Sequence, residues 1–384
     1  MPVVVLEASD GPGGRVRSDH VDGFVLDRGF QVYLTAYPEG KEMWDYESLQ
    51  LRSFAPGAMV RIDGEFVMVA DPLRAPSKLL ATVQAPIGTA RDKARIAALA
   101  LGARRGTIAD DLAAEDTSTL RYLRNRGFSE TVIDRFFRPL FGGVLLDDEL
   151  QTSSRMFRFV WRMMATGDSA VPAGGMQALP DQLVSRLPDG VLRYGHNVAA
   201  VTPTSIQLDT GEGVAARSVV VAVEGPAAAR LLDEVPDPGS RHVSCVYFAA
   251  DRPPFDEPVL VLNGDGSDDG PINNLAVMTN VSPDYGPPGS SLIAAASLDL
   301  GDGLESRVRR QLADWYGPQV DGWRHVRTYR IPHAQPTQSP PFPPQREAAT
   351  RAGVFVAGDH RATASINGAL ESGRLAAEAV LAAD

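Results

Sequence analysis

The stretch VFVAGD at residues 354–359, followed by SINGALESG at residues 365–373, decides how the rest of the sequence is interpreted. Its four apolar residues predict a strand that is buried on both faces. Gly358 and Asp359 then lie at the carboxyl edge of a sheet, where open α/β folds bind ligands. A helix predicted over about 365–383 would point free N–H groups and its positive dipole end at that edge. The sequence therefore predicts a ligand site here, and the alternative is an alanine-rich core helix.

The beginning of the chain carries a second pattern of this kind. VVVL at residues 3–6 predicts a short strand buried on both faces, and Glu7 follows it. In a dinucleotide-binding fold, an acidic residue at the end of a strand accepts hydrogen bonds from ribose hydroxyls. Gly13 and Gly14 would let the backbone approach a diphosphate, and Arg15 would supply charged donors. Taken alone, the glycine pair fits an ordinary turn equally well.

Other local patterns predict individual elements. DRGFQV at residues 27–32 predicts a turn that enters a strand, and its Phe30 is a candidate contact for a bound ligand. Asp63-Gly64, between two apolar stretches, predicts a β-hairpin. From about residue 73 to residue 167 the apolar period is helical, and the expected helix N-caps are Ser118, Ser129 and either Ser153 or Ser154.

Strand patterns return at the start, middle and end of the chain, with helical and mixed segments between them. This order predicts an α/β fold with one discontinuous domain and a second domain built from the insertions. We assign residues 1–72, 171–232 and 337–384 to the first domain, and residues 73–170 and 233–336 to the second. Residues 336–344 are rich in proline and are expected to form an extended connector.

Composition excludes several classes of function. The 384 residues carry a formal net charge of -11, which disfavours binding to nucleic acid. No apolar run approaches the roughly 20 residues of a membrane-spanning helix, and no signal peptide is visible. The single cysteine, Cys245, excludes an internal disulfide and a cysteine metal cluster, and the six histidines lack metal-ligand spacing. A reducing cytoplasm fits this composition.

Together these patterns resemble the FAD-containing amine oxidase superfamily, which includes monoamine oxidases, protoporphyrinogen oxidases and phytoene desaturases. The resemblance runs from residue 3 to the C-terminus. Glu7-Ala8 with Gly13-Gly14-Arg15 resembles the family's EA…GGR segment. Pro172–Met176 resembles its P-x-G-G-M segment. Gly358-Asp359 with Ile366-Asn367 resembles its closing flavin motif.

The resemblance implies a Rossmann-like, discontinuous FAD-binding domain and an α+β substrate domain. It also implies an FAD-dependent oxidoreductase whose FAD is bound non-covalently, because Cys245 is far from the C-terminal position at which some relatives attach flavin. A backbone strand at Val198 would contact the adenine. Within this reading, His360 is a candidate neighbour of the flavin, Tyr329 is either a pocket wall or a core residue, and the aromatic and methionine residues between Phe136 and Met164 line either a substrate tunnel or the core.

One departure from the family concerns the phosphate-binding loop. The family begins with a strand and a G-x-G-x-x-G turn about 20 or more residues before the ribose glutamate. Here that glutamate is Glu7. We expect the first βα unit to be missing from this sequence, the natural gene product to be longer, and the 384-residue chain to bind FAD weakly. A central strand of ~6 buried apolar residues contributes on the order of 10 kcal/mol.

A second departure concerns the substrate. Many amine oxidases of the family place a lysine near flavin N5, but no lysine occurs here after Lys93. We therefore expect hydride removal from a C–H bond of a small, apolar substrate, with no assignment of the electron acceptor. Two alternatives stay open: a cofactor-free remnant that acts as a binding or scaffold protein, and a flavin-dependent isomerase.

Overall fold

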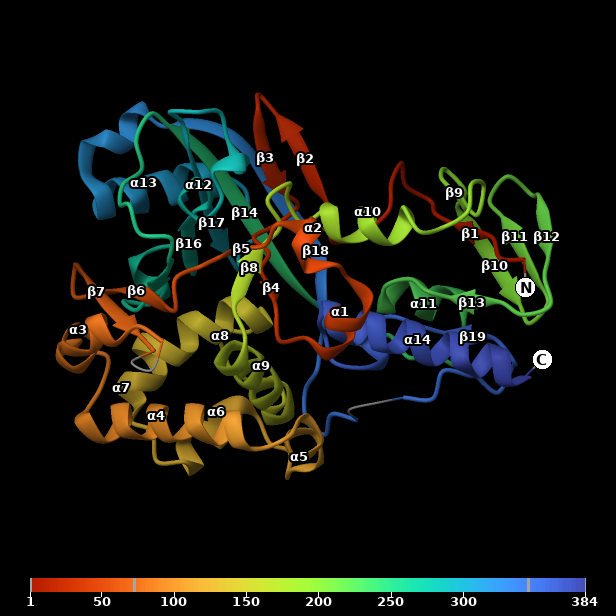
Figure 1. Cartoon of the computed structure of the whole chain (residues 1–384), viewed down its shortest axis with the longest axis horizontal. Helices are drawn as coiled ribbons and strands as arrows, with labels where there is room; N and C mark the ends of the chain where they lie inside the picture. Colours follow the sequence, from red (N-terminus) through yellow and green to blue (C-terminus); the bar gives the residue numbers. More distant parts are fainter. Residues whose placement is uncertain (1, 72–73, 344–345, 384) are drawn as a thin grey trace.

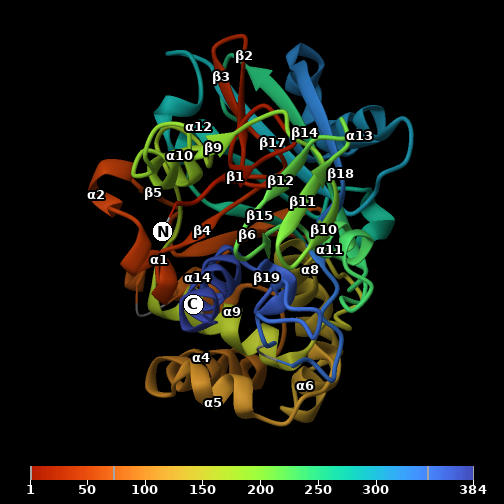
Figure 2. The same cartoon turned by 90° about the vertical axis from the view of Figure 1, so that its right-hand side faces the viewer.

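The structure is a computed structural model that describes residues 2–71, 74–343 and 346–383. A large mixed sheet occupies one half of the molecule, and a layer of helices lies beneath it in Figure 1. The other half is built from short strands and two helices, and it brings together the first and last segments of the chain (Figures 1 and 2).

The large sheet has seven strands in the order β18-β14-β17-β16-β15-β6-β7. All neighbours are antiparallel except β15 and β6, which are parallel. The hairpin predicted at Asp63-Gly64 is confirmed as β6–β7, with both turn residues at positive φ. The strands are β18 (Arg324–Pro336), β14 (Ser240–Ala250), β17 (Ser291–Ser297), β16 (Asn274–Val277), β15 (Leu260–Asn263), β6 (Gly57–Ile62) and β7 (Glu65–Ala70).

One face of this sheet is covered by α13 (Leu304–Tyr316). The helix places Leu304, Val308 and Leu312 on one face, and these residues pack against Val246 and Phe248 of β14. Short helical segments lie between the strands of this sheet or follow α13: η3 (Ser267–Asp269), α12 (Met278–Val281), η4 (Pro283–Tyr285) and η5 (Gly317–Gly322).

The helical layer confirms the predicted caps. The hydroxyls of Ser118, Ser129 and Ser153 each accept a backbone N–H at the start of a helix. The helix expected after Ser129 changes to π geometry before Pro139, whose ring lacks the N–H that an α-helix would use there. The layer comprises η1 (Pro76–Lys78), α3 (Leu79–Gln84), α4 (Ala90–Arg105), α5 (Ile108–Ala113), α6 (Thr119–Asn125), α7 (Glu130–Val132), the π segment η2 (Ile133–Phe137), α8 (Arg138–Leu145) and α9 (Ser154–Thr166).

The other half contains three small sheets. Strand β1 (Val5–Leu6) pairs in parallel with β9 (Leu192–Arg193), and β13 (Val220–Val221) pairs in parallel with β19 (Phe355–Val356). An antiparallel sheet is formed by β10 (Val198–Thr202), β11 (Ser205–Leu208) and β12 (Gly213–Ala215). The helices are α11 (Gly225–Leu231) and α14 (Ile366–Ala383), and the second confirms the predicted C-terminal helix.

The prediction that residues 3–6 form a strand buried on both faces is wrong for the described structure. The exposed fractions are 53% for Val3, 45% for Val4 and 40% for Val5. Strand β13 is also short, and its Val220 is 42% exposed. Among the described residues, β1 and β13 each belong to a sheet of only two strands.

Short elements connect the two halves. They are the hairpin of β2 (Ser18–Val21) and β3 (Phe24–Asp27), the sheet of β4 (Tyr33–Leu34), β8 (Ser169–Val171) and β5 (Arg52–Ser53), and the helices α1 (Pro38–Met43), α2 (Tyr46–Leu49), α10 (Ala178–Val184) and η6 (Asp359–Arg361). Of the proline-rich connector, Pro336 ends β18, residues 337–343 form neither helix nor strand, and Pro344 lies outside the described residues. No helix among the described residues has the length and apolar character needed to cross a membrane.

The carboxyl group of Asp27 joins several of these connecting segments in the interior. Its Oδ1 accepts hydrogen bonds from the Ser18 hydroxyl at 2.6 Å and from the Met176 N–H at 2.9 Å, and its Oδ2 accepts one from the Tyr285 hydroxyl at 2.8 Å. The hydroxyl of Tyr247 donates to the carbonyl of Asp27 at 2.9 Å. Burial raises the pKa of the Asp27 carboxyl to about 6, although the three donors oppose this rise.

We predict that Asp27 makes stability depend on pH. Its pKa of about 6 in the folded state exceeds the ordinary value of 3.8, so the folded state binds more protons between these values. The protonated Asp27 carboxyl therefore stabilises the folded state fully below about pH 4. The free energy of unfolding falls by on the order of 3 kcal/mol as the pH rises from there through 6. Urea denaturation from pH 4 to pH 7 should show this fall in the parent chain and not in Asp27→Asn. Parallel curves for the two proteins would contradict the prediction.

Candidate functional site

A cavity of about 1950 Å³ lies where the first and last segments of the chain meet, and it extends under the large sheet into the helical layer. The structure places ten of the eleven predicted site residues on its wall: Glu7, Ala8, Gly13, Gly14, Arg15, Phe30, Val198, Gly358, Asp359 and Ile366. Asn367 is the exception, because its side chain is buried and accepts a hydrogen bond from the N–H of Glu39 at 3.1 Å. Asn367 therefore holds α1 against α14 and does not face the cavity.

Arg15 and Asp359 join the two ends of the chain at the cavity wall. One guanidinium nitrogen of Arg15 lies 2.8 Å from Asp359 Oδ1, and another donates to the carbonyl of Ala334 at 2.7 Å. The Asp359 side chain is 7% exposed and that of Arg15 is 32% exposed. Oδ1 of Asp359 is buried and lies against the guanidinium of Arg15, so this ion pair holds the Asp359 carboxylate in place at the cavity wall.

Gly13 and Gly14 adopt backbone conformations that favour glycine, with φ of 106° and 56°. A Cβ on Gly13 would lie 2.3 Å from the carbonyl oxygen of Val16, so a side chain cannot fit there without a backbone shift. A Cβ on Gly14 would have no heavy atom within 4 Å, because this residue borders the open cavity. The loop thus presents bare backbone to the cavity at Gly14.

Glu7 is held by the loop that follows it. Its Oε1 accepts the N–H of Ser9 at 2.7 Å, and its carbonyl accepts the N–H of His196 at 2.9 Å. Its second carboxylate oxygen accepts no hydrogen bond from the described residues. The side chain is half-buried on the cavity wall. Glu7 can therefore accept hydroxyl donors from a ligand that lies in the cavity.

The start of α14 faces the same space. Ser365 acts as the N-cap, because its hydroxyl accepts the N–H of Gly368 at 3.0 Å. The N–H group of Ile366, which lines the cavity, finds no acceptor in the described parts of the chain. This donor, together with the helix dipole, makes this end of the cavity favourable for an electron-rich group.

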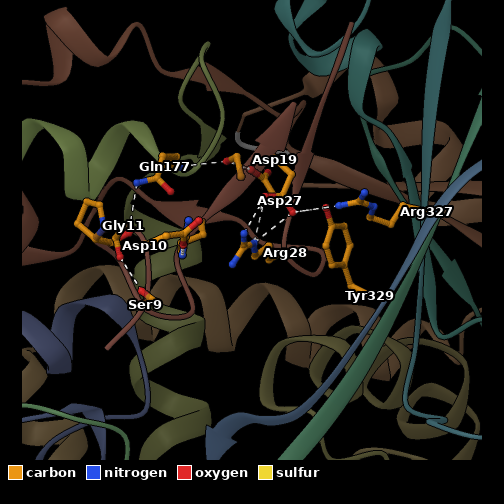
Figure 3. Close-up of polar contacts among 12 residues, drawn as sticks. Ser9, Asp10, Gly11, Asp19, Asp27, Arg28, Gln177, Arg327 and Tyr329 are labelled. Atoms are coloured by element: carbon orange, nitrogen blue, oxygen red, sulfur yellow. Dashed lines mark hydrogen bonds and ion pairs between the residues drawn. The ribbon is translucent and has the colours of Figure 1, made fainter. Parts of the chain in front are cut away.

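A charged cluster lies behind the opposite wall and is shown in Figure 3. Arg28 donates two hydrogen bonds to Asp19 from Nε and one from Nη2. The Tyr329 hydroxyl donates to the same carboxylate at 2.6 Å. Arg327 lies 3.5 Å from the same carboxylate. The hydrogen bonds from Arg28 lower the pKa of Asp19, and burial raises that of Tyr329. Arg28 reaches the cavity, whereas Tyr329 does not line it and serves this cluster instead.

His360, a sequence candidate for the ligand site, lies behind Asp359. It does not line the cavity, and it is 4% exposed. Neither ring nitrogen has a hydrogen-bond partner among the described residues, and burial lowers its pKa to about 4. Its ring is therefore neutral near pH 7 and packs beneath Gly358, where a Cβ would lie 2.7 Å from the imidazole.

The arm of the cavity inside the helical layer is apolar. Among the aromatic and methionine candidates, Phe136, Trp161 and Met164 line it. The other members are buried in the core and do not reach it: Phe137, Phe141, Met156, Phe157, Phe159 and Met163. Lys93 borders the arm, but its ammonium donates to the carbonyls of Val83 and Ala85. The apolar arm therefore lies between α4, α8 and α9.

Several cavity residues were not predicted from the sequence. Gln31, Gln335 and Asn274 bring amide groups to the wall. Gln31 stands within the DRGFQV segment and could have been included with Phe30. The other two come from strands of the large sheet, and no local pattern marks them. The described residues contain no group of three or more histidine, cysteine, aspartate or glutamate side chains that could hold a metal ion.

Comparison with known proteins places this architecture in a family. The family model described as flavin containing amine oxidoreductase matches residues 1–381. No curated protein matches the chain.

Several solved structures are similar to the chain at low sequence identity. A putative protoporphyrinogen oxidase from Exiguobacterium sp. 255-15 has 17% identity and a TM-score of 0.73, with 100% of this chain and 93% of that chain covered. Cyclohexylamine oxidase from Brevibacterium oxydans IH-35A has 14% identity and a TM-score of 0.73, with coverage of 99% and 94%. A reduced UDP-galactopyranose mutase has 17% identity and a TM-score of 0.65, with coverage of 99% and 90%. At these identities the likeness shows a shared fold.

Proposed function

Because this chain belongs to the family of flavin containing amine oxidoreductases, with FAD as its cofactor, we propose that it removes a hydride from a carbon atom of a small, apolar substrate. The observation that carries this proposal is the continuity of the cavity. One end holds the charged and glycine-rich residues of both chain termini, and the other end is an apolar arm between helices.

The residues at the polar end fit FAD. Glu7 has a free carboxylate oxygen for the ribose hydroxyls, and Val198, which lines the cavity at the start of β10, would contact the adenine. Gly14 offers open space beside bare backbone, and Arg15 offers charged donors for the diphosphate. Asp359 would accept from the ribityl hydroxyls, and the start of α14 would face the electron-rich edge of the ring. When bound, FAD supplies the hydride acceptor.

The residues of the apolar arm would bind and orient the substrate. Phe136, Trp161 and Met164 offer apolar surface, and they exclude water from the carbon that reacts. The ammonium group of Lys93 is engaged by two backbone carbonyls, so it holds the turn between α3 and α4 and is not free to act on the substrate. This arrangement favours an apolar C–H donor over a charged amine.

We predict that Gly14→Leu abolishes most FAD binding, because the new side chain fills the space beside the backbone. The matched control is Gly211→Leu, since Gly211 also has positive φ and open space but lies in a remote turn. Visible flavin absorbance per polypeptide measures the content, and thermal unfolding checks the fold. FAD content that is equal in the two variants would show that the cofactor does not pass Gly14.

The reaction is tested by anaerobic reduction of the bound flavin. Apolar alkenes and cyclic C–H donors should bleach the flavin, and primary amines should not. Ala97→Trp should slow the bleaching at least about tenfold with unchanged flavin content, because Ala97 lines the arm. Ala98→Trp is the control, because Ala98 is exposed on the same helix but does not line the cavity. Bleaching by amines alone would refute the substrate class, and turnover without bleaching would indicate an isomerase.

A further inference from the structure

The outer rim of the apolar arm carries an unusual concentration of exposed apolar side chains. Helix α3 has no buried residue. The exposed fractions are 48% for Leu79, 68% for Leu80 and 57% for Val83, and Leu101 of α4 is 40% exposed. We call these four residues the α3–α4 rim. Exposed apolar side chains that gather on two helices joined by Lys93 are a candidate interaction site.

The rim is basic, although the chain as a whole is acidic. Residues 74–105 contain seven lysines and arginines and a single acidic residue, Asp92, whereas the whole chain has a formal net charge of -11. Asp92 is buried at 1% exposure, where it accepts hydrogen bonds from Thr89 and Ser129. Lys78 and Arg91 are exposed and form no ion pair among the described residues. Arg74 and Arg104 are paired with Asp168 and Asp71, so the positive charge available to an anion at the rim includes Lys78 and Arg91.

The rim surrounds the entrance of the arm. Leu79 and Val83 of α3 border the cavity, and so do Ala94, Ala97 and Leu101 of α4. Lys93 fixes the two helices at this point by donating to the carbonyls at the end of α3. An apolar molecule that reaches the rim can thus enter the arm along a continuous apolar surface.

We propose that the α3–α4 rim docks on the surface of an anionic lipid bilayer, and that the substrate enters the arm from that bilayer. Leu80 and its neighbours would lie at the boundary between headgroups and acyl chains, and Lys78 and Arg91 would face lipid phosphates. Charge complementarity favours this partner, because Lys78 and Arg91 are exposed beside the apolar rim and form no ion pair among the described residues. The role of the bilayer as substrate source rests on the proposed function, whereas docking itself does not.

Vesicle co-sedimentation of the full chain tests the docking. Vesicles of equal parts phosphatidylglycerol and phosphatidylcholine should bind the protein at least about tenfold more tightly than phosphatidylcholine alone, and added salt should weaken the binding. Leu80→Glu should reduce binding at least about tenfold. Its control is Leu381→Glu, which changes a leucine of similar exposure, 66%, at the end of α14 and should bind like the parent.

A charge-reversal pair separates the electrostatic contribution. Lys78→Glu with Arg91→Glu should abolish the preference for anionic vesicles, and Lys41→Glu with Arg310→Glu, exposed on other elements, should preserve it. Absence of vesicle binding by the parent chain, or unchanged binding by Leu80→Glu, would overturn the proposal. A dimer that Leu80→Glu disrupts, without vesicle binding, would likewise overturn it and assign the rim to a second copy. None of these readouts depends on flavin or substrate, so failure here is distinct from failure of the proposed reaction.

Discussion

The buried carboxyl group of Asp27 is the constraint on which the arrangement of the site depends. It collects donors from the β2–β3 hairpin, from the turn at Met176 and from Tyr285 beside the large sheet. A carboxylate without these donors could not be buried at such a position. Because Arg28, Gly29 and Phe30 follow directly and line the cavity, the geometry of Asp27 also sets the position of one cavity wall.

The contact between Arg15 and Asp359 closes the cavity from the other side. It joins residues that are 344 positions apart in sequence, and it brings the glycine loop at Gly13 and Gly14 toward the start of α14. The ion pair is only partly shielded from water, so its own contribution to stability is modest. The ion pair matters because it holds the two ends of the chain together. As a result, Glu7 and Ile366 at the start of α14 line the same cavity.

The shared fold does not assign the reaction. Solved structures with this fold include oxidases and a mutase, so the substrate must be argued from the cavity. The proposed apolar substrate rests on the apolar arm of the cavity and on the engaged ammonium group of Lys93.

The sequence by itself determined the features that depend on neighbouring residues. The hairpin at Asp63-Gly64, the caps at Ser118, Ser129 and Ser153, and the order of strand, Gly358-Asp359 and helix all follow from local hydrogen bonding and apolar period. The tertiary structure alone decided that Asn367 turns toward Glu39, that His360 lies behind the cavity, and that residues 3–5 are exposed. These outcomes depend on which distant segment lies beside each residue. The partner of a strand edge or of a carboxylate is chosen by contacts that no local pattern encodes.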